Sequence, residues 1–129
     1  MKEPRWVDRR TLVLLHEEIL AEHGGLPGVR DPGLLDSALA QAKNLFAYNE
    51  RCDLADLAAA HAFGISQNHP FRDGNKRVAF LSVGLFLKLN KVQLVCSQRE
   101  AIETFFALAA GQLPEADLAT WIRSRMKPS

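Results

Sequence analysis

Apolar residues recur at the three- and four-residue spacing of an amphipathic helix along most of the chain. Short polar stretches and stretches containing glycine or proline interrupt this pattern, so we expect several separate helices. The spacing predicts helices over approximately residues 8–23, 31–48, 53–68, 75–90, 97–110 and 114–127. Together these helices would hold roughly 70% of the chain, against about 30–35% in an average soluble protein. The pattern therefore predicts an all-α fold of about six helices.

Local signals agree with these helix starts. Asp8, Asp31 and Asp53 are each expected to be N-cap residues, because a short polar side chain can accept a hydrogen bond from the first helical turn. Ser97 followed by Glu100 has the spacing of a capping box. Only the β-prone segment 92–95 is expected to be extended.

The segment from Asn75 to Asn90 is apolar on nearly every face, whereas a surface helix has a polar face. We therefore predict that this helix is the central one and that the other helices pack around it. The alanine-rich segment 53–68 favours helix and permits close packing against its neighbours.

Composition narrows the class of protein. The 129 residues fit one domain, spanning residues 1–129. A net charge of +1 argues against a strongly basic nucleic-acid binder. Cys52 and Cys96 are too few for a disulfide framework and have no metal-ligand spacing. No apolar run approaches the roughly 18 residues of a membrane span, and the N-terminus has no signal-peptide pattern, so we expect a cytoplasmic protein without a membrane partner.

One stretch of nine residues, HPFRDGNKR at positions 69–77, carries the candidate chemistry. It leads into the apolar helix, whose first turn leaves N–H groups unpaired and carries a partial positive charge. Lys76 and Arg77 place two cations in this turn, where they oppose the helix dipole. A bound phosphate would resolve that conflict. Gly74 lets backbone approach closely there because it has no Cβ.

Two neighbouring side chains add reactive groups. His69 is suited to proton transfer near neutral pH, and Asp73 offers a hard oxygen ligand for a magnesium ion that carries phosphates. Each residue also has a purely structural interpretation. Asp73 alone could be the N-cap of the following helix, and Lys76 and Arg77 alone could form a solvated face. The joint occurrence favours chemistry on a nucleotide phosphate.

The segment HPFRDGNKR resembles the signature of the Fic/Doc (Fido) superfamily, His-x-Phe-x-Asp/Glu-Gly/Ala-Asn-x-Arg. Lys76 at the variable position matches the Doc (death-on-curing) branch, whereas Fic proteins have glycine there. The upstream stretch GGLPGVRDPGLLDSAL resembles a second recognisable stretch of the Doc family. Length and helix order agree as well, so the resemblance covers nearly the whole chain.

The resemblance implies a toxin of a toxin–antitoxin pair. Doc proteins are protein kinases that move the γ-phosphate of ATP to a threonine of the translation elongation factor that delivers aminoacyl-tRNA. By position, His69 would be the general base and Asp73 would bind Mg²⁺. The backbone of Gly74 and Asn75, with Lys76 and Arg77, would hold the ATP phosphates. The partners implied are this target and an antitoxin whose disordered segment folds into an apolar groove; no direct contact with nucleic acid is expected.

Two alternatives stay open. A Fic-like site would transfer AMP to a protein hydroxyl, and Lys76 argues against it because lysine fills space that a pyrophosphate would need. A silent binding module is the other alternative. The argument against it is that four motif residues are intact: His69, Asp73, Asn75 and Arg77. The polar stretch 48–53 lies where the superfamily has a flap that docks the target segment.

Four further side chains need an interpretation. His16 and His61 lie at helical spacing among apolar residues and are expected to be hydrogen-bonded packing residues. Cys52 follows Arg51 in a loop and could be mildly reactive. Phe71 is expected to anchor its loop in the core.

Overall fold

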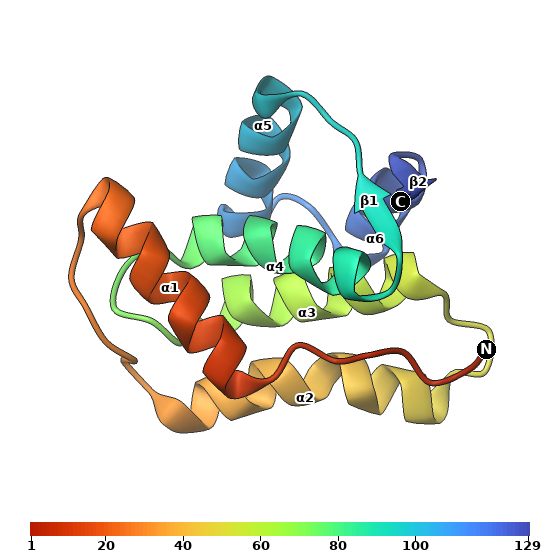
Figure 1. Cartoon of the computed structure of the whole chain (residues 1–129), viewed down its shortest axis with the longest axis horizontal. Coiled ribbons are helices and arrows are strands. Elements are labelled where there is room, and N and C mark those ends of the chain that lie inside the picture. Colours follow the sequence, from red (N-terminus) through yellow and green to blue (C-terminus); the bar gives the residue numbers. More distant parts are fainter.

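The computed structural model describes all residues 1–129 and confirms the all-α prediction, with six helices and two short strands (Figure 1). The helices are α1 (Arg9–His23), α2 (Pro32–Tyr48), α3 (Leu54–Asn68), α4 (Asn75–Leu89), α5 (Gln98–Ala109) and α6 (Glu115–Arg123). The strands β1 (Val92–Leu94) and β2 (Met126–Pro128) pair antiparallel, with Val92 opposite Pro128. No helix is both long and apolar enough to cross a bilayer.

The predicted helix starts are confirmed. The side chains of Asp8, Asp31, Asp53 and Ser97 each accept a hydrogen bond from a backbone N–H in the first turn of their own helix. Capping boxes form at the start of α3 and of α5, because the third residue of each helix returns a hydrogen bond to the cap. These local rules therefore define the start of most of the helices.

The end of the last helix was predicted wrongly. α6 ends at Arg123 rather than near residue 127, and the following residues form β2. The Arg125 carbonyl accepts from the Val95 N–H at 2.8 Å, and the Ser129 N–H donates to the Lys91 carbonyl at 3.2 Å. β1 offers unpaired backbone groups to this segment, and pairing with a strand distant in sequence overrides the local helical pattern.

The domain has one central helix, but it is α3 rather than α4. Ten of the fifteen α3 residues are buried, against seven of fifteen in α4. α3 packs against α2, α4, α5 and α6, and Figure 1 shows it between α2 and α4. Its small side chains allow this: a Cβ at Gly64 would lie only 3.1 Å from the Ala38 Cα of α2. Leu81 and Leu85 of α4 are only half-buried, although Phe86 is fully buried.

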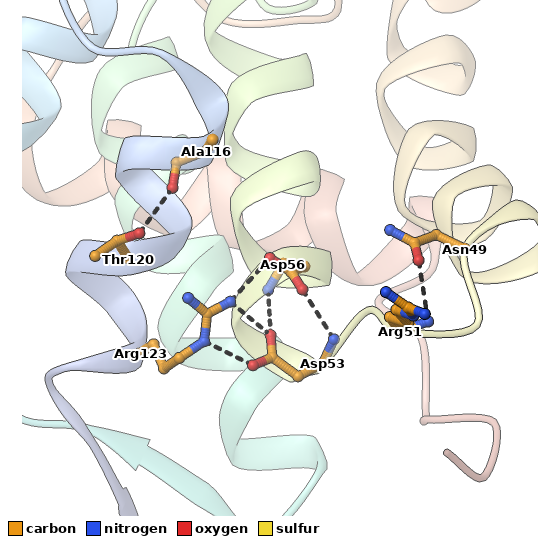
Figure 2. Close-up of polar contacts among 7 residues, drawn as sticks. All are labelled: Asn49, Arg51, Asp53, Asp56, Ala116, Thr120 and Arg123. Atoms are coloured by element: carbon orange, nitrogen blue, oxygen red, sulfur yellow. Dashed lines mark hydrogen bonds and ion pairs between the residues drawn. The ribbon is translucent and has the colours of Figure 1, made fainter.

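A network of ion pairs connects the end of α6 to the start of α3 (Figure 2). The Arg123 Nε lies 2.7 Å from an Asp53 carboxylate oxygen, and one Arg123 Nη lies 2.9 Å from Asp56. The hydrogen bonds from Arg123, together with those from Asp56, lower the pKa of Asp53 to about 2. The same carboxylates cap α3, so the network joins a helix start to a distant helix end.

We expect Arg123→Met to lower the free energy of unfolding at pH 7 by about 1 kcal/mol, because both side chains are nearly half exposed and solvent screens the pair. The Asp53 pKa is depressed in the folded state. The ionised Asp53 carboxylate therefore stabilises the folded protein fully above the pKa that this group has in the unfolded chain. This stabilisation is lost as the pH falls toward 2. Urea unfolding of both proteins at pH 7 and at pH 2 measures this, and the difference should shrink at the lower pH. Arg99→Met, at an exposed pair within α5, is the matched control and should change little.

Candidate active site

The motif 69–77 forms the connection between α3 and α4 and enters the first turn of α4. His69 follows the last residue of α3 in the left-handed conformation, with φ 48° and ψ 56°, and its side chain is exposed. Phe71 is 1% exposed, which confirms its predicted role as the anchor of the loop. His69 therefore lies at the surface, at the end of α3 and at the start of the short connection that leads into α4.

Asn75 closes this loop from within. Its side-chain amide donates to the Phe71 carbonyl at 2.9 Å and accepts from the Phe71 N–H at 3.1 Å, and the residue is buried. Both polar atoms of the Asn75 side chain are therefore used in hydrogen bonds that hold the loop. Only its backbone N–H, in the first turn of α4, is available to an anion.

The α1–α2 connection, residues 24–31, lies against the motif. Val29 forms an isolated β-bridge with Phe71, and the Arg30 N–H donates to the Pro70 carbonyl at 2.7 Å. The Arg30 guanidinium donates to the carbonyls of Asn68 and His69, each at 2.8 Å. Sequence reasoning missed this role of Arg30. The only available signal was its place in the second stretch that resembles the Doc family.

The expected flap position is wrong. Residues 48–53 precede α3, whereas His69 follows it, and fifteen helical residues separate the two by about 22 Å. Figure 2 shows this stretch at the α3 N-terminus, where the Arg51 N–H donates to the Asn49 side chain at 3.0 Å. The segment that does contact the motif is 24–31, since it pairs with the loop through backbone hydrogen bonds.

The N-terminus of α4 has no side-chain cap. Gly74 is the N-cap residue, with φ 77°, and no side chain accepts a hydrogen bond from the first turn. The interpretation of Asp73 as a simple N-cap is therefore wrong. The Asp73 carboxylate instead accepts from the Leu26 N–H at 3.1 Å. The first N–H groups of α4 remain available, in an arrangement that suits an anion.

The two cations of this turn extend toward different helices. Arg77 contacts the Nε2 of His23 at the end of α1, and because a guanidinium only donates, His23 must accept through that nitrogen. The Lys76 ammonium lies over the Phe106 ring of α5, 5.0 Å from its centroid. Both side chains are exposed. From the uncapped turn, Arg77 therefore extends toward α1 and Lys76 toward α5.

Asp73 suits a magnesium ion that arrives with phosphates. Its carboxylate is exposed, and one of its oxygens is held by Leu26, which fixes the orientation of the other. Magnesium in nucleotide sites commonly takes one or two carboxylates and completes its shell with phosphate oxygens and water. Nowhere in the chain do three or more His, Cys, Asp or Glu side chains form a group that could hold a metal ion.

The remaining candidates are buried. His16 is a hydrogen-bonded packing residue, as predicted. His61 is buried, but neither ring nitrogen has a partner, so the expected hydrogen bond does not form. Cys52 is also buried, and burial raises the pKa of its thiol, so the prediction of a reactive thiol is wrong.

Known proteins resemble this chain over most of its length. A sequence model of the Fic/DOC family matches residues 6–87. The chain is 34% identical over 119 residues to "Protein kinase doc" of Escherichia phage P1, which covers 92% of this chain and 94% of that protein. It is 42% identical over 72 residues to "Toxin Doc" of Mycolicibacterium smegmatis, which covers 55% of each chain. The chain belongs to the Fic/Doc family and, within it, to the Doc branch.

Proposed function

We propose that this protein is a toxin kinase that transfers the γ-phosphate of ATP to a threonine hydroxyl of a translation elongation factor. The observation that carries the proposal is an exposed histidine in the short connection that leads into an uncapped helix N-terminus, whose first turn carries two exposed cations. The relatives named as a protein kinase and as a toxin support the same activity. A nucleotide phosphate is the anion that this arrangement suits best.

His69 is the general base in this proposal. The threonine oxygen attacks the γ-phosphorus, and its proton passes to the His69 imidazole as the new P–O bond forms. The bond between the γ-phosphorus and the β,γ-bridging oxygen breaks, and ADP leaves with that electron pair. The Arg30 hydrogen bonds to the carbonyls of Asn68 and His69 hold the backbone that carries this base.

The first turn of α4 holds the phosphates. The backbone N–H groups of Gly74 and Asn75 donate to phosphate oxygens, and Lys76 and Arg77 add positive charge on either side. Asp73 would hold Mg²⁺, which would neutralise charge on the phosphate oxygens.

The alternative transfer of AMP depends on which phosphorus faces His69. Lys76 replaces the glycine of Fic proteins with a long charged side chain at the second position of α4. That charge favours the triphosphate orientation in which the γ-phosphate lies nearest the base, and the phosphorus presented to the nucleophile is the one that reacts. Phosphoryl transfer is therefore the preferred proposal.

The reaction class is tested by the mass that the target protein gains after incubation with Mg·ATP. We expect one phosphoryl group, and a gain of one AMP would overturn the kinase proposal. Lys76→Gly should weaken phosphoryl transfer because it removes a cation beside the phosphates. Lys91→Gly is the matched control: Lys91 is exposed, has φ 62°, and lies at the opposite end of α4, so glycine is tolerated there and transfer should be unchanged.

We also propose a cognate antitoxin with a disordered segment that folds as a helix on this protein. Ile102 and Phe106, one turn apart on α5, are each 61% exposed, and Phe106 contacts Lys76. If the antitoxin helix packs its apolar face against these side chains, it would bury them. It would also cover the Lys76 ammonium next to the site. Co-purification with the product of a small upstream reading frame tests this pairing.

A further inference from the structure

His16 of α1 lies directly beneath the turn that opens α4. Its Nε2 is 2.9 Å from the Asp73 carbonyl oxygen, and its ring stacks on Phe71 with centroids 4.0 Å apart and planes at 16°. His16 is 2% exposed. Because a carbonyl oxygen can only accept, Nε2 carries the proton in this hydrogen bond. A buried side chain from another helix therefore holds one peptide group of the motif.

This hydrogen bond determines which way the Asp73–Gly74 peptide faces. The chain has no cis peptide bonds, and in a planar trans peptide the C=O and the N–H point in opposite directions. With the Asp73 carbonyl directed at α1, the Gly74 N–H must point away from α1. It therefore faces the exposed side of the turn, together with the other free N–H groups at the start of α4.

Without His16 the opposite orientation would be accessible. Gly74 has φ 77°, and glycine adopts positive and negative φ with similar ease, so rotation of this peptide meets little steric resistance. Rotation would turn the Asp73 carbonyl oxygen toward the exposed side in place of the Gly74 N–H. A carbonyl dipole there would repel a phosphate that the N–H attracts.

We propose that His16 is a positioning residue that locks the Asp73–Gly74 peptide in its anion-binding orientation. The proposal rests on the proposed function, in which the Gly74 N–H binds a phosphate of ATP. His16 itself touches no substrate, because it is buried behind the turn, and it acts only through the peptide that it holds. The stacked Phe71 ring fixes the plane of the imidazole, so Nε2 remains aimed at the carbonyl.

Two substitutions separate the hydrogen bond from the packing. His16→Gln keeps an N–H near the position of Nε2, whereas His16→Phe keeps a ring stacked on Phe71 but has no donor. We expect His16→Phe to lose roughly 10²-fold in kcat/KM for Mg·ATP, as when one oriented backbone donor is lost. KM for the protein target should be unchanged in that variant, which a general loss of structure would not allow. His16→Gln should keep most of the wild-type rate.

Crystal structures of the variants test the orientation of the Asp73–Gly74 peptide independently of any measurement of activity. We expect the Asp73–Gly74 peptide to be rotated in His16→Phe and to keep its orientation in His16→Gln; His16→Leu replaces the phenylalanine variant if that protein does not fold. A peptide that keeps its orientation in the donor-free variant overturns the proposal, and so does a donor-free variant with wild-type kcat/KM. If the wild type transfers no phosphate while the Asp73–Gly74 peptide still rotates in His16→Phe, the proposed function fails. In that case the positioning role of His16 stands.

Discussion

Replacing His69 by alanine is expected to reduce phosphoryl transfer about 10²–10⁴-fold, the usual cost of losing a positioned general base. The side chain is exposed, and the hydrogen bonds of this residue are made by its backbone alone, to Ile65 and Arg30. Its removal therefore breaks no hydrogen bond, and the helical content should remain unchanged. Transfer of labelled γ-phosphate to the target, with circular dichroism of the same sample, measures both quantities.

A second variant separates the imidazole from the backbone. His69 has φ 48°, a conformation that asparagine adopts more readily than alanine does. His69→Asn should therefore preserve the loop and still lack the base, so its activity should be as low as that of His69→Ala. Growth arrest and target labelling at wild-type levels in both variants would show that another group takes the proton.

The helix starts followed from the sequence because each depends on residues three or four positions apart. Asp53 and Asp56 form their capping box within one turn, as do Ser97 and Glu100, and the distant arginines that contact these carboxylates leave the capping hydrogen bonds in place. The strand β2 could not be predicted from the sequence, because Met126 becomes extended only by pairing with Leu94. Such pairing is decided by which distant backbone groups are left without partners, and local periodicity does not report this.

The central position of α3 was missed for a related reason. Large apolar side chains on every face of the following helix suggested that α4 is the most enclosed. However, enclosure depends on how closely neighbours can approach, and the alanines and Gly64 of α3 permit an approach that leucines do not. Small side chains give a weak hydrophobic signal in sequence although they mark the tightest packing.

The candidate site was found from sequence only where it is contiguous. His69, Asp73 and Gly74 lie within six residues, so their chemistry could be read together. Arg30 and His16 come from the α1–α2 loop and from α1, and each contributes through a hydrogen bond to a motif carbonyl. A side chain that acts on a distant backbone group leaves no pattern of spacing, so its role becomes visible only in the structure.

His61 is expected to make the folded protein sensitive to mild acid. It is completely buried in α3, both ring nitrogens lack partners, and burial lowers its pKa from 6.5 to about 4. Between these two pH values the unfolded chain binds a proton that the folded chain does not, so stability decreases as the pH falls from 6.5 toward 4. A shift of this size corresponds to about 3 kcal/mol in the free energy of unfolding.

His61→Leu should remove this pH dependence, because leucine has similar bulk and no group to protonate. The variant should be at least as stable as the wild type at pH 7, since it also removes two buried polar atoms without partners. Other groups titrate in the same range and contribute equally to both proteins, so the difference between their urea midpoints at each pH isolates His61. His69→Asn, at an exposed histidine, should follow the wild-type curve. If the wild-type and His61→Leu curves run parallel from pH 7 to pH 4, the folded protein accommodates the charged imidazole, and burial without partners is not what sets its acid stability.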